Sequence, residues 1–77
     1  MRIESRDDAA EWAASWLAAH GRRLHNARRF RRAAADHRGI AERVLARLGD
    51  DATASRHESA AAYLDGLAAS IEKDPTP

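Results

Sequence analysis

The sequence contains no cysteine, two prolines, four glycines, four aromatic residues and a single lysine. The absence of cysteine excludes disulfide bonds, thiolate zinc sites and thiol catalysis. No apolar run approaches the roughly 18–20 residues that cross a bilayer, so no membrane association is expected. The charged stretch from Met1 to Asp8 lacks the apolar core of a signal peptide. We therefore expect a cytoplasmic protein, and its bias towards arginine and alanine suggests a bacterial source.

Large apolar side chains are also scarce. Hydrophobic residues make up 44% of the 77 residues, but 19 of these 34 are alanine. Alanine, arginine, leucine and glutamate are good helix formers, so the composition favours an all-α fold with a thin apolar seam. A chain this short buries only about 60% of its unfolded surface. We therefore expect a partner, or a second copy of the chain, to complete the core.

The spacing of apolar residues predicts one helical domain. Its three predicted helices cover residues 5–20, 22–48 and 52–73, followed by a flexible tail over residues 74–77. Ser5 is a suitable N-cap for the first helix, and Gly21 and Gly49 are suitable C-caps for the first two. Short connections favour antiparallel neighbours, and hence a three-helix antiparallel bundle with a long middle helix.

The middle helix has one weak point, Gly39, since a break there would divide the chain into four helices. The apolar phase continues unchanged past Gly39, which favours a single helix. Such a helix outruns the first one and leaves part of its seam uncovered, so a homodimer is expected. The predicted self-association seam consists of Phe30, His37, Val44 and Leu48. Because burial disfavours a charged imidazole, His37 would make association or folding weaken at acidic pH.

Charge is distributed unevenly although the net charge is only +1. Residues 1–21 carry −2, residues 22–48 carry +7 and residues 49–77 carry −4. Two interpretations remain open. In the first, basic residues beside the apolar seam pair with acids of the first and third helices, as flanking charges do in coiled coils; these are Arg23, Arg31 and Arg38.

In the second interpretation, outward-facing arginines form a surface for an acidic protein or for nucleic-acid phosphates. The residues opposite the seam are Arg28, Arg29, Arg32, Arg43 and Arg47, with His25 among them. Trp12 and Trp16 lie one turn apart on the first helix. They are either an anchor pair for a partner groove or the filling of the core.

Catalytic and metal-binding patterns are absent. No phosphate loop, nucleophile elbow or pair of helix-spaced metal ligands occurs, so we expect no enzyme, no cofactor, no metal site and no small-molecule substrate. The sequence instead predicts a small helical protein–protein interaction module (a regulator, adaptor or small subunit) that self-associates. The alternative is a small nucleic-acid-binding regulator that uses the arginine-rich face of the middle helix.

Overall fold

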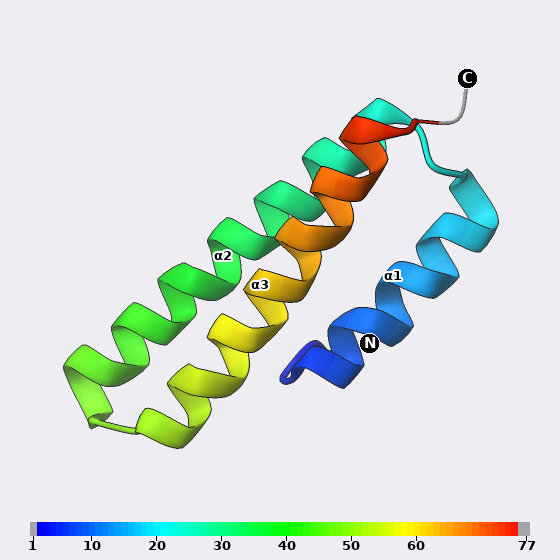
Figure 1. Cartoon of the computed structure of the whole chain (residues 1–77). Helices are drawn as coiled ribbons and strands as arrows, with labels where there is room; N and C mark the ends of the chain where they lie inside the picture. The colour runs from blue at the N-terminus through cyan, green and yellow to red at the C-terminus, as the bar shows by residue number, and fades with distance from the viewer. Residues whose placement is uncertain (1, 76–77) are drawn as a thin grey trace.

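The computed structural model describes residues 2–75, which fold into three helices (Figure 1). α1 spans Arg6–His20, α2 spans Leu24–Leu48 and α3 spans Asp51–Lys73, and no strand occurs among the described residues. The prediction of an all-α fold is confirmed. Asp74 and Pro75 follow α3, while residues 76 and 77 of the predicted tail lie outside the described residues.

Capping residues set the helix boundaries. The Ser5 hydroxyl accepts a hydrogen bond of 3.2 Å from a backbone N–H in the first turn of α1. The Asp50 carboxylate accepts a similar bond of 3.1 Å in the first turn of α3, so each helix start gains a partner for an N–H that the helix itself leaves unpaired. Gly21 and Gly49 end α1 and α2 with positive φ angles of 77° and 61°, which glycine adopts without a steric penalty.

α2 passes Gly39 without interruption. Ala34 and Ala41, on either side of Gly39, are fully buried, and His37 between them is 8% exposed. The same stripe of α2 therefore faces α3 before and after the glycine. Tertiary packing along this stripe outweighs the roughly 1 kcal/mol that a helical glycine costs relative to alanine. The described chain accordingly has three helices and not four.

α2 and α3 form an antiparallel hairpin, and α1 lies along only part of it (Figure 1). We call the part beside α1 the covered end, which comprises α1 with residues 24–36 of α2 and 59–73 of α3. The main apolar cluster lies entirely at this end, with Phe30, Leu64 and Ile71 as its largest fully buried apolar side chains. α1 contributes Ala9 and Ala13 to the cluster.

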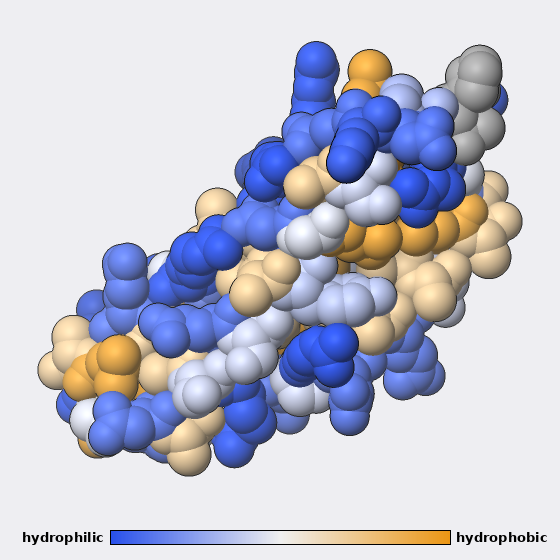
Figure 2. Space-filling model, viewed as in Figure 1, coloured by the Kyte–Doolittle hydropathy of each residue, from blue (hydrophilic) through white to orange (hydrophobic). Residues whose placement is uncertain are grey.

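The remainder of the hairpin, residues 37–48 and 51–58, is the bare end, which the start of α1 approaches only near Ser55 and Arg56. Its buried residues are two alanines and two histidines: Ala41, Ala54, His37 and His57. Figure 2 shows a small hydrophobic patch where α2 meets α3, and the exposed Leu45 and Leu48 lie in this part of the chain. The molecule is elongated, measuring 44 × 20 × 13 Å.

α3 covers more of α2 than the sequence led us to expect. It has 23 residues against 25 in α2, whereas α1 has 15. α3 therefore covers the apolar stripe of α2 along nearly its whole length. Only α1 is too short, and it leaves the bare end of the hairpin without a third helix. Phe30, a predicted member of the self-association seam, is fully buried in the core of one chain. Its side chain consequently presents no surface to a second copy.

Candidate binding groove

A groove of about 600 Å³ runs between α1 and α2 at the covered end. Two aromatic and four basic side chains line it together with one carboxylate and one alanine: Trp12, Trp16, His25, Arg28, Arg29, Arg32, Asp36 and Ala33. The groove thus brings the predicted anchor pair together with three of the five predicted outward arginines. We call it the Trp–Arg groove.

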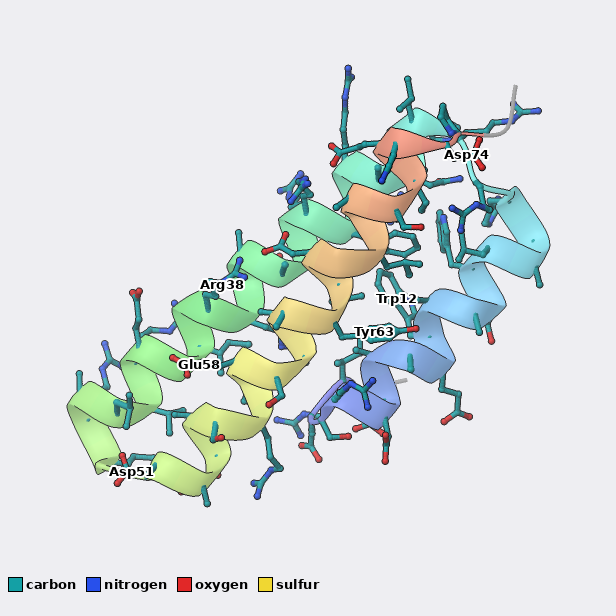
Figure 3. The ribbon with its side chains drawn as sticks, in the orientation of Figure 1. Trp12, Arg38, Asp51, Glu58, Tyr63 and Asp74 are labelled. Carbon is teal, nitrogen blue, oxygen red and sulfur yellow. The ribbon has the colours of Figure 1, made fainter. Side chains whose placement is uncertain are left out.

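Trp12 and Trp16 pack on the core and also lie in the wall of the groove, whereas the sequence left open a choice between a core pair and a partner anchor. Both are half-buried and pack against the apolar cluster, and both also line the groove. Figure 3 shows Trp12 directed from α1 towards the hairpin, where its ring meets Phe30 edge-on with centroids 5.5 Å apart. The centroids of the two indole rings are 6.3 Å apart and their planes are tilted by 39°. The pair is therefore part of the core and part of the groove wall.

Asn26 holds Trp16 in place, a role that was not predicted from the sequence. Asn26 is fully buried, and its Oδ1 accepts a hydrogen bond of 2.9 Å from Trp16 Nε1. Its Nδ2 donates to the backbone carbonyls of His20 at 3.3 Å and Gly21 at 2.7 Å, at a helix end whose carbonyls lack partners within the helix. One amide therefore joins the end of α1, the start of α2 and the groove wall.

The arginines of the groove have no ion-pair partner among residues 2–75. None of the ion pairs in this part of the chain involves Arg28, Arg29 or Arg32, and all three residues are exposed. The Arg29 guanidinium lies 4.1 Å from the centroid of the Trp16 ring, a cation–π arrangement. Guanidinium groups bind carboxylates and phosphates with two parallel hydrogen bonds. The groove thus offers donors for an anionic ligand beside an apolar wall.

The arginines that flank the seam behave differently. Arg31 Nε lies 3.2 Å from both carboxylate oxygens of Glu72, and Arg31 Nη1 lies 3.3 Å from Asp65. Arg38 also pairs with Asp65. The hydrogen bonds from Arg31 lower the pKa of the Glu72 carboxyl. Pairing with the third helix is confirmed for these two arginines, whereas Arg23 forms no ion pair within the described residues and α2 forms none with α1.

The remaining predicted site residues lie outside the groove. Arg43 and Arg47 are exposed on the bare end, away from the tryptophans. Val44 is half-buried and Leu48 is 76% exposed. The five outward arginines are thus divided between a concave site at the covered end and an open helix face at the bare end.

His37 is buried against a partner that the sequence did not indicate. Its Nδ1 lies 2.9 Å from Nδ1 of His57 on α3, and the two rings are nearly parallel, at 15°. Burial lowers the pKa of His37, and the neighbouring His57 lowers it further. Nothing in the local sequence around His57 distinguishes it from a surface histidine, because its burial depends on the register of α3 against α2.

Neither a cluster of metal ligands nor similarity to a known protein identifies a ligand for the Trp–Arg groove. Within residues 2–75, no three histidine or acidic side chains gather closely enough to hold a metal ion. None of the helices in this part of the chain combines the length and apolar character that a bilayer crossing needs. No protein-family model, no curated protein and no solved structure matches the chain.

Proposed function

We propose that this protein is a small helical interaction module, an adaptor, regulator or small subunit, whose Trp–Arg groove binds an acidic segment of a partner protein. One observation carries the proposal. Three exposed guanidinium groups without ion-pair partners in residues 2–75 lie beside two half-buried indole rings in a single groove. Tryptophan and arginine are the residue types most enriched where binding energy concentrates in protein interfaces.

The shape of the groove suits a helix. Its α2 wall runs from His25 to Asp36, about 17 Å at 1.5 Å per residue, or about three helical turns. An amphipathic helix would place apolar side chains on the indole rings and its carboxylates on Arg28 and Arg32, in the way that helices dock into apolar grooves. Asp36 at one end of the groove would disfavour a carboxylate there and so favour one orientation of the bound helix.

Nucleic acid is the less favoured ligand. The indole planes are tilted by 39° with centroids 6.3 Å apart, so the two rings do not form a parallel slot for a base. The chain carries a net charge of only +1 and both flanking segments are acidic, which weakens long-range attraction to a polyanion. The observation in favour of nucleic acid is that Arg43 and Arg47 extend the same exposed face of α2 beyond the groove.

A tryptophan fluorescence titration tests the proposal, because both tryptophans line the groove. The probe is a synthetic amphipathic helical peptide of about 14 residues, four turns, with leucine on one face and glutamate on the other. We expect saturable binding to the wild type. In the variant Arg28→Ala/Arg32→Ala the affinity should fall by at least about tenfold, which corresponds to about 1.4 kcal/mol.

The matched control is the variant Arg43→Ala/Arg47→Ala, which removes the same charge from the same helix outside the groove. Its affinity for the peptide should stay within about threefold of wild type. Equal loss in both variants would mean that only net charge matters and would contradict the groove. Stronger binding to a thymidine oligonucleotide than to the peptide, with a steep salt dependence, would favour the nucleic-acid function instead.

For the bare end we propose a second copy of the chain as the partner. Leu45 and Leu48 are 41% and 76% exposed, and they are two of the three large apolar side chains that the described chain exposes. Burying them against a second bare end would remove this apolar surface from water. A mass measurement in solution checks this, with twice the 8.5 kDa of one chain as the expected result. The variant Leu45→Glu/Leu48→Glu should run at the mass of one chain.

A further inference from the structure

The pair His37 and His57 is the one polar contact buried between α2 and α3 at the bare end. The two Nδ1 atoms are 2.9 Å apart, the ring centroids 5.1 Å apart, and each residue is 8% exposed. No carboxylate in residues 2–75 lies within ion-pair distance of either imidazole. The only other residues buried around them at this end are alanines, Ala41 and Ala54.

Charged residues lie near the two histidines, but none of those in residues 2–75 forms an ion pair with either ring. On α2, Asp36 precedes His37 and is exposed, and its charge opposes the effects of burial and of His57 only in part. On α3, Arg56 and Glu58 flank His57 and are exposed. α1 brings Arg6 and Asp7 to the shallow surface beside Ser55 and Ser59. An added positive charge on the pair would therefore be poorly compensated.

The contact between the two rings requires that only one of the two Nδ1 atoms carries a proton. A hydrogen bond between two Nδ1 atoms requires one imidazole to donate its Nδ1–H and the other to accept through a lone pair. A first proton can be taken up on the outer Nε2 of the donor ring without breaking this bond. A second proton must occupy the accepting Nδ1, which places two N–H groups and two positive charges against one another. The contact is then lost.

We propose that His37 and His57 form a proton-operated latch that holds the bare end of the hairpin closed near neutral pH and releases it, separately from the covered end, when both rings are protonated. The separation follows from the packing. The covered end has Phe30, Leu64, Ile71 and the tryptophans, none of which titrates. The bare end has only two small buried apolar residues besides the latch.

The direction of the pH effect follows from linkage. The pKa of His37 is lower in the folded protein than its ordinary value because burial penalises the charged ring and His57 adds to the penalty. The open state therefore binds more protons than the closed state once the pH falls below about 6.5. The latch is fully stabilising above that pH and weakens as the pH falls. The opening equilibrium constant rises about tenfold per pH unit for each extra proton bound by the open state.

Backbone amide hydrogen exchange, read as protection factors between about pH 7.5 and about pH 5, tests the latch on the full chain. Protection at residues 39–48 and 54–58, whose amides have helical acceptors, should fall by at least about tenfold over this range. Protection at residues 9–16 and 60–71 should change by less than about threefold. An equal fall at both ends would show global acid destabilisation, and no fall at either end would show that the pair does not respond to protons. Either result overturns the latch.

Two variants and a control assign the effect to the pair. The variant His37→Leu/His57→Leu replaces both rings with apolar side chains and should abolish the pH dependence at the bare end. If this variant does not fold, His57→Gln serves instead, because a neutral amide can still accept a hydrogen bond from protonated His37. The fall in the logarithm of the protection factor between the two pH values should then be at most half of that in the wild type. His25→Gln changes an exposed histidine of the groove and should retain the wild-type fall. A wild-type fall in His57→Gln would refute the latch.

Discussion

The two ends of the α2–α3 hairpin are built from the same helices but hold together in different ways. At the covered end, α1 adds two indole rings to a core that already contains Phe30, Leu64 and Ile71. At the bare end, two alanines and a pair of histidines fill the space between α2 and α3. Because free energy of folding follows buried apolar area, most of it must come from the covered end. The Trp–Arg groove lies there as well, since α1 forms one of its walls.

The largest expected effect is that of Phe30→Ala. Phe30 is fully buried and meets Trp12 edge-on, so its truncation should cost about 3–5 kcal/mol and leave little cooperative unfolding. Leu48→Ala is the comparison at the bare end, where the side chain is 76% exposed in a single chain. Measured at a dilution at which the chain is monomeric, it should cost less than about 0.5 kcal/mol. Urea denaturation followed by circular dichroism measures both. Similar losses in the two variants would break the distinction between the ends.

Asn26→Ala comes next in size. It removes the acceptor for the Trp16 indole N–H and the donor to two carbonyls at the end of α1, and should cost about 2 kcal/mol, because buried polar groups are left unpaired. Asn26→Asp keeps the acceptor for Trp16 but sets a buried carboxylate oxygen against these two carbonyl oxygens, so it should cost at least as much as Asn26→Ala. Urea midpoints and the Trp emission maximum give the readout. A cost below about 0.5 kcal/mol would show that the α1–α2 junction does not need this amide.

Gly39→Ala should produce the smallest change, and in the stabilising direction. An added Cβ would meet only the Arg43 guanidinium, at 3.3 Å, which is the movable end of an exposed side chain. The gain should be about 0.5–1 kcal/mol, since alanine is the better helix former. Hydrogen exchange should localise the gain to residues around position 39. A loss of stability would mean that Arg43 is held in place and that the bare end is more tightly packed than its alanines indicate.

Local sequence patterns predicted those parts of the structure that depend on neighbours in the chain. Ser5, Gly21 and Gly49 act at helix ends through backbone groups within a few residues. The buried stripe of α2 through Ala34 and Ala41 follows from helical periodicity alone. The opposite charges of the middle and third segments are visible in the sequence. They predict that Arg31 and Arg38 pair with acids of α3, although they do not predict which acids.

Features that depend on how the helices meet could not be predicted. The spacing of Asn26 four residues before Phe30 places it on the buried stripe, but its partners Trp16, His20 and Gly21 reach it only where α1 meets α2. His57 becomes the partner of His37 through the register of α3 against α2. The division of the outward arginines between groove and open face depends on where α1 lies on the hairpin. That position is set by tertiary packing, whereas a helical wheel shows only the angular positions of residues within one helix.

The most direct test of the account is to map the amide and indole N–H chemical shifts of the wild type on addition of the acidic amphipathic peptide. Binding in the Trp–Arg groove predicts that the largest changes occur at the indole N–H groups of Trp12 and Trp16 and along residues 25–36 of α2. Residues 40–48, which carry the other two outward arginines, should change little. Changes spread evenly along the basic face of α2, or centred on the bare end, would contradict the central claim that α1 and α2 together form the binding site.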